Sequence, residues 1–165
     1  MNIPPYDPTR NHPELPISGT MEVDYTLSWE QMRDYGRYSK ISSKITVDRF
    51  PIAGKSGRIV AVEWSLLHPN CDISPGGIRE LIGEENACNI PTWRPARTEH
   101  MFCFGAKFPE YQLKFPIIGL DVSEYNFCLV LEATDSGYTR FLNTNYIHSS
   151  FIPKCRFLRV REVLG

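Results

Sequence analysis

Two pairs of histidine and cysteine with the same spacing could support metal or nucleophile chemistry in this chain. They are His68 and Cys71 in "HPNC", and His100 and Cys103 in "HMFC". A structural zinc site needs four such ligands in a tetrahedral array, and they are often offered as close pairs. Cys88 lies between the two pairs and is a fifth candidate. The residue types therefore raise the hypothesis of a zinc protein or a cysteine-dependent enzyme.

The expected geometry of the second pair argues against a zinc site. The sequence "HMFCFGAKF" (residues 100–108) alternates like a β-strand, in which residues three apart face opposite sides of the sheet. His100 would then point away from Cys103, so we predict no metal and no other cofactor. A cysteine–histidine nucleophile would also need an orienting group, and no family signature surrounds these residues. A zinc-containing or cysteine-dependent enzyme is accordingly the third hypothesis of function.

The loop "NIPTWRPAR" (residues 89–97) is the first candidate recognition element. Prolines 91 and 95 bracket Trp93 and Arg94 and should stiffen the segment, and Arg97 follows closely. Tryptophan and arginine are enriched at binding hot spots, and a stiff loop loses less entropy on binding. The alternative is that Trp93 folds back onto its own domain, because tryptophans usually bury most of their area.

The basic C-terminal strand "KCRFLRVREVL" is the second candidate. Arg159 and Arg161 share a strand face with Phe157, as basic and aromatic groups do on barrels that bind single-stranded nucleic acid. The alternative is a solvated edge strand that its charges protect from aggregation. The predicted binding residues are thus Trp93, Arg94, Arg97, Arg159 and Arg161.

Composition and charge narrow the classes of function. The 165 residues fit one domain, and a formal charge of −1 argues against non-specific binding to nucleic acid or membrane as the main task. No stretch is apolar over the length that spans a bilayer, so we expect no membrane insertion. The five cysteines and the lack of an apolar leader suggest reduced thiols in the cytoplasm or another intracellular compartment.

Residues 1–19 are predicted to form a proline-rich arm, and residues 20–165 a single β-rich domain. The arm holds five of the thirteen prolines, and Ile3, Tyr6, Leu15 and Ile17 could bury apolar area on a partner or a second copy. The alternative is a disordered terminus on a monomer.

Two short helices and about eight strands are expected. Ser28 and Gln31 form a capping box at the start of the first helix, and residues 74–85 form the second, with Ser74 as its cap and Pro75 at its first position. The predicted strands are residues 21–27, 44–50, 58–67, 100–108, 112–122, 125–133, 138–147 and 155–164. Pro116 should make the fifth of these an edge strand or break it. Short strands joined by hairpins predict a mainly β fold, an antiparallel sandwich or barrel.

The alternation within these strands also predicts the core. Its members are Val60, Val62, Trp64, Phe102, Phe104, Phe127, Leu129, Leu131, Leu158 and Val160. The leading functional hypothesis is a non-enzymatic binding or assembly module that uses loops, edge strands and the arm, with a protein partner or a second copy. The second hypothesis is a single-stranded nucleic-acid-binding barrel that uses the C-terminal strand.

Overall fold

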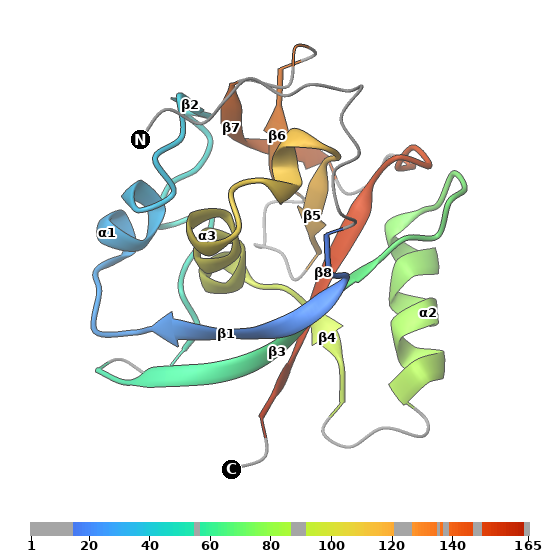
Figure 1. Cartoon of the computed structure of the whole chain (residues 1–165), viewed down its shortest axis with the longest axis horizontal. Coiled ribbons are helices and arrows are strands. Elements are labelled where there is room, and N and C mark those ends of the chain that lie inside the picture. The colour runs from blue at the N-terminus through green and yellow to red at the C-terminus, as the bar shows by residue number, and fades with distance from the viewer. Residues whose placement is uncertain are drawn as a thin grey trace.

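One mixed β-sheet organises the part of the chain that the computed structural model describes, residues 15–54, 57–86, 92–120, 127–134, 136, 139–146 and 150–163. Eight strands and three α-helices lie within these residues (Figure 1). The strands are β1 (Ser18–Asp24), β2 (Lys40–Ile41), β3 (Ile59–Leu67), β4 (Arg94–Pro95), β5 (Ile117–Gly119), β6 (Phe127–Ala133), β7 (Arg140–Tyr146) and β8 (Arg156–Glu162). The helices are α1 (Trp29–Asp34), α2 (Pro75–Asn86) and α3 (Thr98–Lys107), with a 3-10 turn, η1 (Tyr111–Leu113).

The sheet is open, and its strand order is β1-β3-β8-β5-β6-β7-β2, with β4 paired to β8. The pairs β5–β8 and β2–β7 are parallel and the others are antiparallel. The mainly β class is therefore confirmed, whereas the expected antiparallel sandwich or barrel is confirmed only in part, because the sheet is mixed and open. Segments distant in the chain pair side by side, and short-range hairpin signals carry no information about such pairing.

β8 lies inside the sheet rather than at an edge. One of its sides pairs antiparallel with β3, from Leu67 opposite Phe157 to Val62 opposite Glu162. Its other side pairs with β5 near Arg156 and with β4 near Val160. The alternative of an edge strand guarded by charge is therefore wrong for this segment.

Helices cover both faces of the sheet. Leu129, Leu131 and Leu158 join the core cluster that contains α3 and α1, whereas the alternate residues Val130 and Phe157 pack with α2 on the opposite face. Strands covered on both faces read as continuous apolar runs. This explains the run "CLVL" in β6, which a half-buried strand would not need.

Eight of the ten predicted core residues are buried. The two exceptions, Val60 and Phe127, are partly buried and pack against the same cluster. Phe102 and Phe104 are fully buried, but they lie on a helix and not on a strand.

The segment predicted as the strand 100–108 belongs to helix α3, so that prediction is wrong. Apart from Cys103, the residues from Thr98 to Gly105 are all buried. The helix therefore has no broad polar stripe. Its sequence is also rich in aromatic residues, which are common in strands, so the segment has the sequence pattern of a strand. Gly105 lets Tyr38 pack closely, because a Cβ there would lie 1.9 Å from the Tyr38 hydroxyl oxygen.

Two other helices follow their local signals as predicted. Ser28 and Gln31 form both hydrogen bonds of the capping box at the start of α1. Helix α2 begins at Pro75, and the Ser74 hydroxyl accepts a hydrogen bond from the Gly77 N–H at 3.1 Å. These signals are local, so tertiary packing does not override them.

Two further strand predictions are wrong in part. Residues 44–50 form turns instead of a strand. Residues 112–122 contain only the short β5, which begins directly after Pro116 and lies inside the sheet, so Pro116 ends the irregular segment and does not mark an edge. Residues 1–14 of the predicted arm lie outside the described residues, and β1 begins at Ser18.

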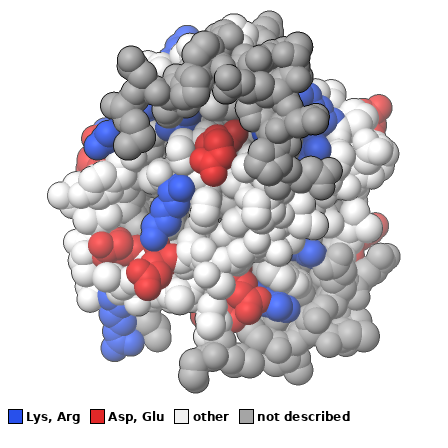
Figure 2. Space-filling model, in the orientation of Figure 1, with Lys and Arg blue, Asp and Glu red and all other residues white. Residues whose placement is uncertain are grey.

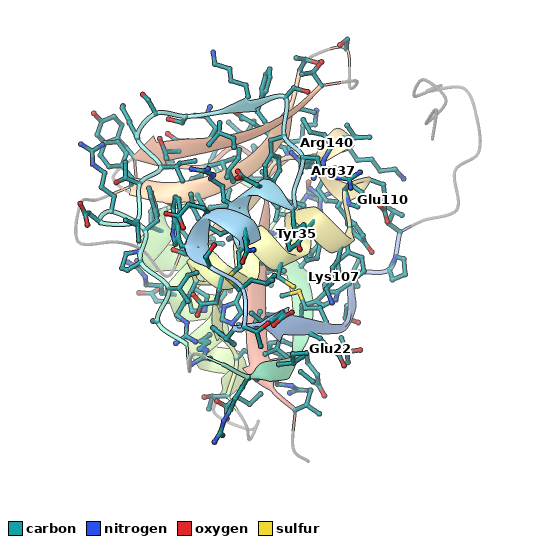
Figure 3. The ribbon with its side chains drawn as sticks, turned by 90° about the vertical axis from the view of Figure 1, so that its left-hand side faces the viewer. Glu22, Tyr35, Arg37, Lys107, Glu110 and Arg140 are labelled. Carbon is teal, nitrogen blue, oxygen red and sulfur yellow. The ribbon has the colours of Figure 1, made fainter. Side chains whose placement is uncertain are left out.

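Charges of both signs are interspersed on the surface of the α1, α3 and β1 side. Figure 2 shows acidic and basic side chains separated by uncharged surface. In Figure 3, Arg140, Arg37, Glu110, Lys107 and Glu22 follow one another down a neighbouring side. Over the described residues, no large surface area of a single charge sign is visible in this view.

Leu129→Ala should lower the free energy of unfolding by about 2–5 kcal/mol, because Leu129 is 3% exposed and its truncation leaves a cavity. Urea denaturation measures this loss. The matched control is Ile59→Ala on β3, where the side chain is 58% exposed and the expected loss is under about 1 kcal/mol. Equal small losses at both positions would contradict the burial of β6.

Candidate functional site

The five predicted binding residues gather around β8, on two faces of the sheet. Arg94 lies opposite Val160 on the face that α3 covers. Trp93 stacks with Arg159 and Arg161 on the face that α2 covers. The structure therefore divides the predicted site into a stack and a pocket.

The stack consists of Trp93, Arg159 and Arg161. The two guanidinium carbons lie 4.8 Å and 4.3 Å from the Trp93 ring centroid. Arg161 also forms an ion pair with Glu63, at 2.5 Å between Nε and Oε2, and Arg159 hydrogen-bonds to the Ser65 hydroxyl. Each such cation–π contact contributes about 0.5–1 kcal/mol at exposed sites. These contacts hold Trp93, which directly precedes β4, against the side chains of β8.

The pocket, which we call the arginine pocket, has a volume of about 370 Å³. Three arginines from different elements line it: Arg58 before β3, Arg94 in β4 and Arg97 at the N-cap of α3. His100 from the first turn of α3 and Glu162 from the end of β8 complete its polar lining together with Tyr25.

A buried ion pair fixes Arg97 at the pocket. Glu99 is fully buried, and its Oε1 lies 2.8 Å from Arg97 Nε. The same oxygen accepts a hydrogen bond from the Tyr25 hydroxyl at 3.2 Å. Burial, followed by the charge of Glu99, raises the pKa of Tyr25 to about 12, so Tyr25 remains a protonated donor. Breaking one partner of a buried pair is costly, so this cluster holds its geometry firmly.

His100 carries a buried hydrogen-bond donor beside the pocket. Its Nδ1 accepts the Arg97 N–H at 3.0 Å, so the neutral ring must carry its proton on Nε2. Nε2 is buried and has no partner among the described residues. Burial, then the charges of Arg97 and Arg94, lowers the pKa of His100 to about 3, which keeps the ring neutral at physiological pH.

The residues proposed as zinc ligands are dispersed. His68 Nε2 donates to the Pro153 carbonyl at 2.9 Å, and Cys71 is exposed after β3. His100 faces the arginine pocket, whereas the Cys103 thiol donates to the Glu22 carbonyl of β1. Among the described residues, no three His, Cys, Asp or Glu side chains form a group that could hold a metal ion.

The strand geometry used against zinc was wrong, since His100 and Cys103 lie on a helix. Cys88 lies outside the described residues. Burial raises the pKa of Cys103 to about 11 and that of Cys128 to about 12, so these two thiols are poor nucleophiles.

Sequence reasoning found Arg94 and Arg97, missed Arg58 and Tyr25, and considered His100 only as a zinc ligand or a partner of a cysteine nucleophile. The missed signal is the spacing of three residues from Arg94 to Arg97 to His100, which leads into the first turn of α3. A correct helix prediction would have joined these residues at one helix terminus.

Comparison with known protein families, with curated proteins and with solved structures finds no match for this chain. Within the described residues, no helix is long and apolar enough to cross a bilayer. The function must therefore be argued from the geometry of the site.

His100→Gln should make the protein less sensitive to acid. The unfolded chain binds a proton at His100 below its ordinary pKa of about 6.5, whereas the folded protein does not until about pH 3. Stability is therefore lost as pH falls between these values. Between pH 7 and 4.5, denaturant titrations should show a loss about 2–3 kcal/mol smaller in the variant than in the wild type.

Glutamine suits this test because it closes capping boxes and so still accepts the Arg97 N–H. His68→Gln, at an exposed histidine, is the matched control. An acid dependence unchanged in His100→Gln would contradict the burial of a neutral imidazole.

Proposed function

We propose that this protein is a binding module whose arginine pocket holds an anionic group of its ligand. The observation that carries the proposal is the convergence of Arg58, Arg94 and Arg97, from three different elements, on one pocket at the N-terminus of α3. The proposal retains the binding role expected from the sequence and assigns it to a pocket.

The electrostatics favour a carboxylate or phosphate group. Arg58, Arg94 and Arg97 face one lining carboxylate, Glu162, and the buried Glu99 balances one more charge. Three cations against two anions leave a net positive pocket. The planar fork of arginine matches both kinds of anion, and the N-terminus of the ten-residue α3 adds its partial positive charge.

The same geometry favours binding over catalysis at this pocket. The Nδ1 of His100 is occupied and its Nε2 is protonated, so the ring offers no base at neutral pH. Tyr25 remains protonated, and Glu99 does not line the pocket. The described lining contains no Ser, Thr, Cys, Lys or Asp that could act as a nucleophile.

The nucleic-acid hypothesis receives less support from the stack. Arg159 and Arg161 both lie over Trp93, and Arg161 is paired with Glu63. A base could stack on Trp93 only by displacing these guanidinium groups.

Arg94→Gln should weaken anion binding by at least about tenfold, since a charged hydrogen bond contributes about 1.5–3 kcal/mol. The measurement is calorimetric titration of the full chain with inorganic phosphate and with acetate at constant ionic strength. Arg37→Gln, which removes the same charge at an exposed site on the side shown in Figure 3, should bind as the wild type does.

Equal weakening in both variants would show a general charge effect and contradict the proposal. Failure of both anions to bind the wild type would contradict it as well.

A second candidate role is assembly through the N-terminal end of the sheet. β1 ends the strand order, and Ile17 just before it is 70% exposed. A partner or a second copy could bury this side chain and pair with the edge. Light scattering should give a lower mass, or loss of a partner complex, when residues 1–14 are deleted; an unchanged monomer would contradict this role.

A further inference from the structure

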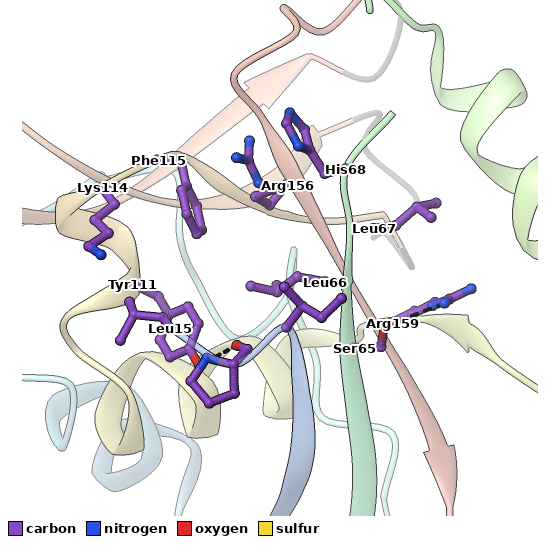
Figure 4. A pocket seen from close by; sticks show the side chains of 12 residues that line it. Leu15, Ser65, Leu66, Leu67, His68, Tyr111, Lys114, Phe115, Arg156 and Arg159 are labelled. Carbon is purple, nitrogen blue, oxygen red and sulfur yellow. Dashed lines mark hydrogen bonds between the residues drawn. The ribbon is translucent and has the colours of Figure 1, made fainter. Parts of the chain in front are cut away.

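A second pocket lies near the opposite end of β8 from the arginine pocket. The segment before β1, the last residues of β3, the turn after η1 and Arg156 of β8 surround it (Figure 4). Its volume is about 540 Å³, within the range of about 300–1,000 Å³ typical of small-molecule sites. The two pockets share no described lining residue. We call this second cavity the amphipathic pocket.

Much of the lining of the amphipathic pocket is apolar. Leu15, Leu66, Tyr111 and Phe115 contribute carbon surface from four separate segments. Tyr111 is 2% exposed, and its hydroxyl donates to the Pro16 carbonyl at 2.5 Å, which fixes the ring. This surface is therefore formed before any ligand arrives.

The charges along the pocket are all of one kind. Apart from the hydroxyl of Tyr111, the ionisable side chains of the described lining are Lys114, Arg156, Arg159 and His68, and none is a carboxylate. The whole chain carries a formal charge of −1, so this is a local excess of positive charge. Figure 4 shows Arg156 and His68 together on the side away from Leu15, whereas Lys114 lies on the other side of Phe115 and points toward Tyr111 and Leu15.

Among the described residues, Arg156 and His68 are held in position by an aromatic ring and by backbone carbonyls, not by carboxylates. The Arg156 guanidinium lies 4.3 Å from the Phe115 ring centroid and donates to a backbone carbonyl two residues earlier. His68 Nε2 is also held by a backbone carbonyl. The ion pairs between described residues include neither Lys114 nor Arg156.

We propose that the amphipathic pocket binds an amphiphilic anion, an aliphatic chain that ends in a carboxylate. The chain would pack against Leu15, Leu66 and Phe115, and the carboxylate would lie beside Arg156, with Lys114 adding its positive charge from the other side of Phe115. A described lining that combines apolar side chains with Arg156 and Lys114 and contains no carboxylate matches this chemistry at both ends of the ligand. The proposal is independent of the arginine pocket, because the two lie at different ends of β8.

The test is calorimetric titration of the full chain with octanoate, decanoate and dodecanoate below their micelle concentrations. Affinity should rise about fourfold for each added methylene that enters the pocket. Decyltrimethylammonium, with the same chain and the opposite charge, should bind at least tenfold more weakly than decanoate.

Two pairs of variants locate the site. Lys114→Gln and Arg156→Gln should each weaken decanoate binding at least fivefold, whereas Lys107→Gln and Arg37→Gln on the side shown in Figure 3 should leave it unchanged. Phosphate binding at the arginine pocket should persist in the first pair, so the two proposals fail separately. If Arg156→Gln does not fold, as judged by thermal unfolding, Lys114→Gln decides.

Equal affinity for decanoate and decyltrimethylammonium would overturn the proposal, as would equal effects of the pocket and control variants. Tighter decanoate binding after deletion of residues 1–14 would also overturn it, because the chain's own N-terminal segment would then be the occupant.

Discussion

The backbone pairing along both edges of β8 is the constraint on which the rest of the structure depends. β8 joins β3 on one side and β5 and β4 on the other, so the two halves of the sheet meet only through this strand. It is also the last strand of the chain, and its partner β3 begins about a hundred residues earlier. The sheet is therefore incomplete until the C-terminal segment has docked, which makes the fold dependent on contacts between distant residues.

This central position also explains where the two pockets form. Alternate residues of β8 face opposite helices, so Leu158 and Val160 face the core beneath α3 while Phe157 faces α2. The two pockets lie near the two ends of β8, where neighbouring strands and helices end. The arginine pocket opens beside Glu162 at one end of the strand, and the amphipathic pocket opens beside Arg156 at the other. A change in the pairing of β8 with β3 would disturb both pockets together.

Local signals in the sequence predicted the parts of the fold that depend on interactions between residues close together in the chain. Ser28 and Ser74 cap helices where expected, and the long strands β3, β6 and β8 lie where apolar residues recur. Helix α3 was missed because it is buried on most sides and so lacks the polar stripe that marks a surface helix. The parallel pairing of β5 with β8 is a long-range choice that no short pattern encodes. The candidate site was half found, since Arg94 and Arg97 were predicted while His100 depended on the missed helix.

The distribution of charge links these structural facts to binding. Like charges repel, so a fold that places Arg58 and Arg94 beside Arg97 must hold them by other means. The buried Glu99 forms an ion pair with Arg97. The backbone N–H of Arg97 donates to Nδ1 of His100, so Nε2 of His100 is left as a buried donor. At the far end of β8, the Phe115 ring and a backbone carbonyl hold Arg156 in the same way. Groups that the fold holds in place lose little freedom when a ligand arrives, and the neutral partners of Arg156 leave its charge available. A chain that is nearly neutral as a whole thus gathers positive charge in two cavities, and this uneven distribution is the physical basis of both proposals of anion binding.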